Sequence, residues 1–126
     1  MTSELRFGPN SAAVEAMLER LSRATRDELE VFTDARTGVR GTIWETARRA
    51  IKGNNAAGAR AAAWDALWKA FPDGGAAWDF AWHPGAPVAW YAIQAVLVRD
   101  LISSEHFGTL TGPWREVFGP TWENEQ

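Results

Sequence analysis

Apolar side chains at helical spacing define the first predicted element of the chain. The spacing i, i+3, i+4 and i+7 lines one face of an α-helix, and it is occupied here by Val14, Met17, Leu18 and Leu21. Gly8-Pro9 is a stop signal before this helix, so residues 1–9 are predicted to form an irregular lead. Asn10 or Ser11 is expected to cap the helix.

Two capping boxes mark the start of the next helices. Thr25 and Glu28 form the first, in which the hydroxyl accepts from an amide three residues on and the carboxylate reaches back. Thr42 and Glu45 repeat the pattern. The glycines between the two boxes leave open whether residues 26–52 form one kinked helix or two.

A tryptophan-rich stripe indicates the following helix. Its heavy face carries Trp64, Leu67, Trp68 and Phe71. Pro72-Asp73-Gly74-Gly75 is expected to end it. A short helix over residues 76–82 should follow and stop at His83-Pro84-Gly85-Ala86-Pro87.

One segment is apolar on every side. From Pro87 to Val98 the sequence has a single strongly polar residue, Gln94. A helix that is apolar all round is buried all round, so the helix over residues 87–102 is predicted to lie at the centre of the domain.

The end of the chain is predicted to be more broken. Ser103 is expected to cap a short turn through Leu110, and Gly112-Pro113 to open a last helix. Residues 121–126 are interpreted as an acidic tail. No segment alternates with period two, so no strand is predicted. The pattern therefore predicts one all-α domain over residues 1–126, a bundle of five to seven helices around the helix 87–102.

Length, charge and residue usage exclude several classes of protein. The chain has 126 residues, 46% hydrophobic and 23% charged, which is typical of one globular domain and not of a disordered chain. It has no cysteine, which excludes disulfides and thiolate metal sites. The net charge of -3 disfavours a general nucleic-acid binder. The sequence shows no targeting segment and no apolar run of membrane-spanning length, so we expect a cytoplasmic protein without membrane association.

Tryptophan is the compositional outlier, with eight copies. The pattern Ala-Ala-Trp-Asp-x-x-Trp occurs at 62–68 and again at 76–82. The candidate interaction residues of this region are Trp64, Trp68, Trp78, Trp82, Trp90 and Tyr91. One interpretation is a core in which alanines of one helix receive tryptophans of another; the other is a surface that binds a partner. Because Trp is rarely fully buried, we expect two or three to be exposed.

Few polar residues are candidates for chemistry. Arg99 and Asp100 interrupt the apolar helix, either as a buried structural pair or as a polar anchor of a ligand pocket near His106. In the first interpretation Asp100 accepts hydrogen bonds from nearby amides or pairs with an arginine. The two histidines lack metal-ligand spacing, and no nucleophile–base pair or phosphate loop is present. We therefore expect no catalytic site, no cofactor and no metal.

A basic stretch lies in the middle of the chain. Residues 36–60 hold six basic side chains and one acidic one, Glu45. The stretch is interpreted as a solvated helical face. The alternative is a contact with phosphate or with an acidic protein.

The C-terminal half resembles a group of small proteins. The segment Ala95-Val96-Leu97-Val98-Arg99-Asp100-Leu101-Ile102, then Glu105-His106-Phe107 and Thr109-Leu110-Thr111-Gly112-Pro113-Trp114-Arg115, resembles the tail of uncharacterised Ala/Trp-rich helical proteins of actinobacteria and their phages. The resemblance spans about half the chain, residues 56–119. It implies a helical fold and a phage or mobile-element setting, and it supplies no catalytic residues.

Two functions follow as expectations. The first is a non-enzymatic module that binds another protein, such as a phage or mobile-element modulator or an immunity-like partner. The alternative is a small-molecule binder or enzyme with a Trp-lined pocket near Asp100 and His106. Tryptophans exposed on a flat or convex face favour the first, and a concave aromatic pocket that holds a carboxylate favours the second. The sequence indicates neither the partner's identity nor the oligomeric state.

Overall fold

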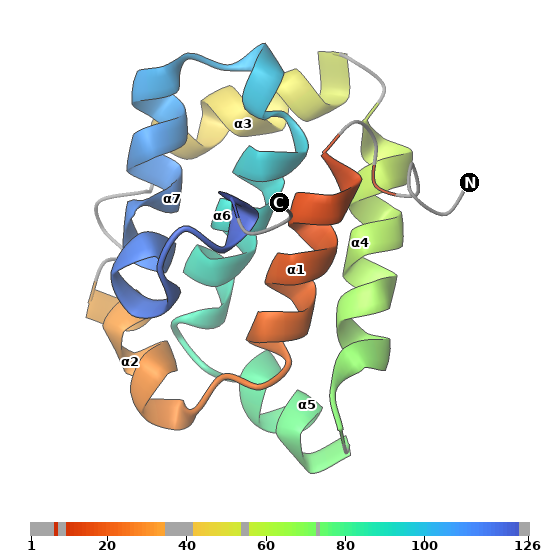
Figure 1. The fold of residues 1–126 in the computed structure, drawn as a ribbon, viewed down its shortest axis with the longest axis vertical. Helices are drawn as coiled ribbons and strands as arrows, with labels where there is room; N and C mark the ends of the chain where they lie inside the picture. Colours follow the sequence, from red (N-terminus) through yellow and green to blue (C-terminus); the bar gives the residue numbers. More distant parts are fainter. Residues whose placement is uncertain (1–6, 8–9, 35–41, 54–55, 73, 124–126) are drawn as a thin grey trace.

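Seven α-helices and two short 3-10 helices make up the described part of the chain in the computed structural model, which covers residues 7, 10–34, 42–53, 56–72 and 74–123. In chain order they are α1 (Ser11–Leu21), α2 (Arg26–Asp34), α3 (Thr42–Gly53), α4 (Ala57–Ala70), α5 (Gly74–Ala81), α6 (Ala86–Leu97), η3 (Arg99–Leu101), α7 (Ser104–Phe118) and η4 (Thr121–Glu123). No strand occurs among these residues. The predicted all-α bundle is confirmed (Figure 1).

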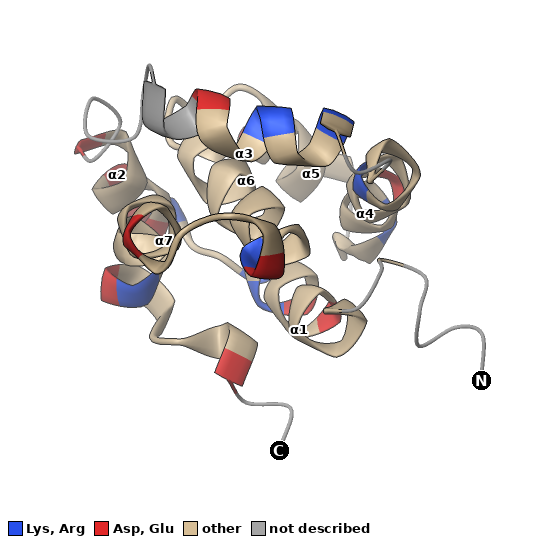
Figure 2. Cartoon of the chain, turned by 90° about the horizontal axis from the view of Figure 1, so that it is seen from above, with Lys and Arg blue, Asp and Glu red and all other residues tan. Residues whose placement is uncertain are grey.

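Helix α6 is the centre of the bundle. It packs against α1, α2, α3, α4 and α7, and every residue from Ala86 to Leu97 is buried except Pro87 and Tyr91. Figure 2 shows α6 without a charged residue along its length, while the charges lie on the surrounding helices. The apolar sequence of α6 thus places it inside the bundle, as predicted.

The central helix is shorter than the sequence predicts. It ends at Leu97, and Arg99–Leu101 forms a separate 3-10 turn, η3. Leu101 is 50% exposed. The predicted end at Ile102 is therefore wrong, because Arg99 and Asp100 are charged and a continued buried helix would carry them out of contact with water.

Local capping holds the start of α2. The Thr25 amide donates to the Glu28 carboxylate at 2.9 Å, and the Glu28 amide donates to the Thr25 hydroxyl at 3.2 Å. The predicted first capping box is confirmed. The second, at Thr42, lies outside the described side chains. The described residues of the region 26–52 form two separate helices, α2 and α3, and residues 35–41 between them lie outside the described part.

Helix α7 runs through the predicted break at Gly112-Pro113. It is continuous from Ser104 to Phe118, with Pro113 inside it. Ser103 is the N-cap, and its hydroxyl accepts from the His106 amide at 3.1 Å. The predicted helix start at Gly112-Pro113 is wrong, because Leu110, Pro113 and Trp114 are all buried and this shared burial outweighs the hydrogen bond that proline removes.

Both predicted terminal segments contribute to the core. Phe7, in the expected irregular lead, is 1% exposed, and Trp122, in the expected acidic tail, is fully buried. The Trp122 ring meets Phe107 edge to face at 5.7 Å, and η4 packs against α1. Residues 121–123 are thus a packed turn rather than a solvated tail. Burial of the large Trp122 ring stabilises the turn by more than full hydration of this acidic segment would.

Candidate functional site

Aromatic side chains of α4, α5 and α6 line a groove of about 340 Å³. Its wall includes Trp64, Trp68, Phe80, Trp90 and Tyr91. The Trp64 ring packs edge to face against both Trp68 and Trp90, with centroids 5.2 and 4.9 Å apart. The fold thus brings four of the six predicted interaction residues into one place, which we call the aromatic groove.

The other two predicted residues lie in an adjoining hollow of about 270 Å³. Trp78 of α5 and Trp82, the residue directly after α5, pack against each other there, with ring centroids 5.6 Å apart. Arg26, Glu30 and Asp79 also line the hollow. We call it the acidic hollow, because its two carboxylates outnumber its guanidinium. Together the groove and the hollow form the aromatic surface.

Three tryptophans of this surface are exposed to solvent. Trp64 is 42% exposed, Trp78 65% and Trp82 72%. Trp68 is half-buried and Trp90 is buried. Among the tryptophans whose side chains are described, the expectation of two or three exposed ones is confirmed. The cluster therefore divides into buried rings, as in the core interpretation, and exposed rings, which are the part available to a partner.

His83 joins the two parts, since it lines both the groove and the hollow. Its Nδ1 accepts from the Gly85 amide at 3.0 Å, which places any proton of the neutral ring on Nε2. Nε2 lies 2.8 Å from a Glu30 carboxylate oxygen without the direction of a good hydrogen bond. The His83 side chain is only 10% exposed, and through Glu30 it connects the end of α5 with α2.

The predicted polar anchor is not assembled. Asp100 is exposed, and the one hydrogen bond that its carboxylate accepts from the described residues is long, 3.4 Å, from Asn10 Nδ2. The Arg99 guanidinium lies 4.7 Å from the centre of the Phe107 ring, and the His106 ring contacts the Ser103 hydroxyl at 3.0 Å. The prediction of a buried pair is wrong, because the chain turns outward at η3 before Asp100.

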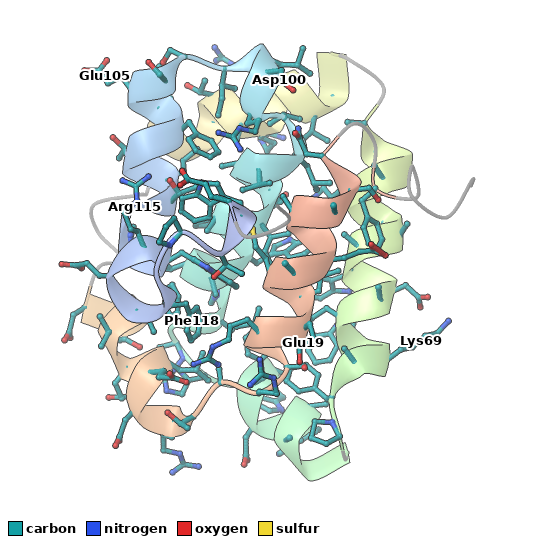
Figure 3. The ribbon with its side chains drawn as sticks, in the orientation of Figure 1. Glu19, Lys69, Asp100, Glu105, Arg115 and Phe118 are labelled. Carbon is teal, nitrogen blue, oxygen red and sulfur yellow. The ribbon has the colours of Figure 1, made fainter. Side chains whose placement is uncertain are left out.

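This polar group also lies far from the tryptophans. Figure 3 shows Asp100 at the end of the bundle opposite to α5, which Figure 1 labels in the same orientation. Neither Asp100 nor His106 lines the aromatic groove or the acidic hollow. The predicted combination of a Trp-lined pocket with these two residues does not form.

The basic stretch is partly neutralised where it is described. Arg48 pairs with Glu45 at 3.0 Å. Arg60 turns inward and donates to the buried Gln94 side chain at 2.5 Å. Arg36 and Arg40 lie outside the described residues. Of the three described arginines of this stretch, one is in an ion pair, one contacts a buried side chain, and the third, Arg49, is exposed.

Sequence reasoning missed several residues of the aromatic surface. Phe80 is 3% exposed and its ring meets Trp68 at 5.8 Å, forming the floor of the groove. Phe80 could have been recognised from its place inside the second Ala-Ala-Trp-Asp repeat. Nothing in the sequence indicates Glu30, because α2 reaches the hollow only by packing beside the start of α6.

The described residues offer neither a metal site nor a membrane span. Within the described ranges, no three His, Cys, Asp or Glu side chains gather in a way that could hold a metal ion. The helices of that same part include none that is long and apolar enough to cross a membrane.

No protein-family model, no curated protein and no solved structure matches this chain.

Proposed function

We propose that this protein is a non-enzymatic interaction module that binds a partner protein through the aromatic surface. The observation that carries the proposal is the exposure of Trp64, Trp78 and Trp82, at 42%, 65% and 72%. Tryptophan is the residue type most enriched at the energetic centres of protein interfaces.

The energetics of exposed tryptophan support this function. Burial of a large apolar side chain contributes about 1.5–3 kcal/mol, and all three rings forgo much of that gain in the free protein. They also gather on two neighbouring helices instead of scattering, and scattered single exposures are the ones that need no explanation. A partner that covers the surface would recover this free energy.

The alternative, a small-molecule binder or enzyme near Asp100 and His106, receives less support. The aromatic groove is concave, as that function requires, but no carboxylate lines it. Asp100 stands exposed at η3. A groove lined mainly by aromatic rings, with no carboxylate to pair with His83, offers shape and apolar contact, which suit recognition rather than reaction.

Site-specific photo-crosslinking tests the proposal. A photoreactive residue at position 82 should give a discrete protein adduct in the native cell, because Trp82 is 72% exposed on the surface. The matched control carries the probe at position 101. Leu101 is 50% exposed in η3, next to Asp100, which lies at the opposite end of the bundle in Figure 3. Equal adduct patterns from both positions, or none from position 82, would overturn the proposal.

A further inference from the structure

Among the described residues, the indole N–H groups of the aromatic groove have no acceptor. Within the described part of the chain, Trp64, Trp68 and Trp90 make no hydrogen bond through Nε1, and the Nε1 atoms of Trp68 and Trp90 are not enclosed. A polar atom that stays accessible in an apolar wall is available to a ligand. The groove therefore presents flat rings together with hydrogen-bond donors.

The ring packing excludes an aromatic cage. Trp64 stands 5.2 Å from Trp68 and 4.9 Å from Trp90 between centroids, edge to face in both cases. At these separations each ring already fills the space over its neighbour, and no gap remains for a quaternary ammonium group among them. The three rings therefore form one wall of the aromatic groove and do not enclose a ligand between them.

A proline-rich segment in the polyproline II conformation has the complementary chemistry. Its backbone makes no internal hydrogen bonds, so its carbonyls are free to accept, and proline has no N–H that would need an acceptor. An amphipathic helix would leave the indole donors unused, since its backbone groups are paired internally. A β-strand would place its backbone N–H groups against aromatic rings, where they would lack acceptors. Grooves lined with aromatic side chains are the general docking sites of proline-rich segments.

The acidic hollow sets the charge of the flanking residues. Asp79 is exposed and has no ion-pair partner among the described residues. Glu30, 64% exposed, meets only His83 there, and Arg26 is the single cation. A lysine or arginine that follows the proline run would enter a hollow that two carboxylates line, and this electrostatic complementarity favours one direction of the segment.

We propose that the partner presents a proline-rich, extended segment with a basic flank, which lies along Trp64, Trp68 and Trp90 and places its cation in the acidic hollow. This inference rests on the proposed function and names the chemistry of the partner.

Titration with synthetic peptides tests it. The probe is a labelled peptide of ten prolines ending in two arginines, followed by fluorescence anisotropy and by the indole N–H resonances. One control peptide replaces the arginines by glutamates, and another replaces the prolines by Gly-Ser. We expect the proline–arginine peptide to bind best, with a preference over the glutamate peptide of about two- to fivefold, as for exposed ion pairs.

Variants assign the contacts. Trp64→Ala should weaken binding about tenfold or more, as at an interface centre, and Trp64→Phe tests the same contact with most of the packing kept. Asp79→Lys, at an exposed position, should reverse the preference between the arginine and glutamate peptides. Leu101→Ala is the matched control and should leave binding unchanged.

The outcomes separate this inference from the proposed function. Binding of the proline peptide no better than the Gly-Ser peptide, or binding that ignores both Trp64 variants, overturns the inference. A helical peptide selected from a random library that needs Trp64 and Trp82 would also overturn it while the proposed function stands. A library without any peptide that depends on these tryptophans would overturn both.

Discussion

The indole N–H of Trp114 donates to the hydroxyl of Thr121 at 3.0 Å, and both residues are buried. This bond joins α7 to the final turn η4 across the core. Thr121→Val keeps the shape but leaves the indole donor unpaired, so we expect a loss of about 1–3 kcal/mol in the free energy of unfolding. Urea denaturation measures it.

The matched control is Thr109→Val. The Thr109 hydroxyl donates to the Glu105 carbonyl at 3.1 Å on the exposed side of α7, where water replaces a lost partner. Its effect should stay within about 0.5 kcal/mol. Equal losses in the two variants would contradict the role given to the Trp114–Thr121 bond.

Gly85 is required by a close approach of α2 to the start of α6. A Cβ at this position would collide with the Leu29 carbonyl oxygen and lie 3.0 Å from Phe32 Cβ. Gly85→Ala should therefore cost about 1–3 kcal/mol, as for other overpacked sites. Gly108→Ala, in α7 with nothing within 4 Å, should instead stabilise by about 0.5–1 kcal/mol. Thermal melts of both variants check the opposite signs.

Glu28 makes stability depend on pH. Burial acts to raise the pKa of Glu28, but the Thr25 amide and the Arg20 guanidinium 2.6 Å away outweigh it and hold the pKa below its ordinary value. The unfolded chain then binds more protons, so stability rises with pH. The contribution is complete above the unfolded pKa of about 4.3 and is lost as the pH falls through the folded pKa.

The variant Glu28→Gln isolates this charge, since glutamine can still complete the capping box. Its melting temperature should lie below that of the wild type at pH 7, and the difference should narrow as the pH falls below about 4.3. Glu116→Gln, at an exposed position, is the control and should change little. If the melting temperature of Glu28→Gln lies below that of the wild type by the same amount at every pH, the charge of Glu28 does not contribute to stability.

The position of α6 predicts a large effect of truncation at its centre. Ile93 is fully buried, so Ile93→Ala should cost about 2–4 kcal/mol in the free energy of unfolding. Leu101→Ala, at a half-exposed site on η3, should cost less than about 0.5 kcal/mol. Similar losses from the two variants would contradict the central place of α6.

Asp100 should prove nearly neutral to stability. Its only described hydrogen bond is the 3.4 Å contact with Asn10 at the surface, and water replaces such a bond readily. Asp100→Ala should shift the free energy of unfolding by no more than about 0.5 kcal/mol. A loss above about 1 kcal/mol in a thermal melt would restore the buried role that the sequence alone favoured.

Features that depend on neighbouring residues could be predicted from the sequence. The stripe from Val14 to Leu21 forms a helix, Thr25 and Glu28 form their reciprocal cap, and the chain turns after Ala70. Spacing and turn chemistry decide such features, because the interacting groups lie within one or two helical turns. The apolar composition of 86–97 likewise required burial, wherever the other helices went.

Features that depend on distant packing could not. Trp64, Trp78 and Trp122 have the same side chain, and each is followed by an acidic residue. Even so, two of them are exposed and one is buried. The continuity of α7 through Pro113, the outward turn at Asp100 and the arrival of Glu30 beside His83 share this origin. Each follows from which helix faces which, since the free energy of burial depends on area covered by residues far along the chain.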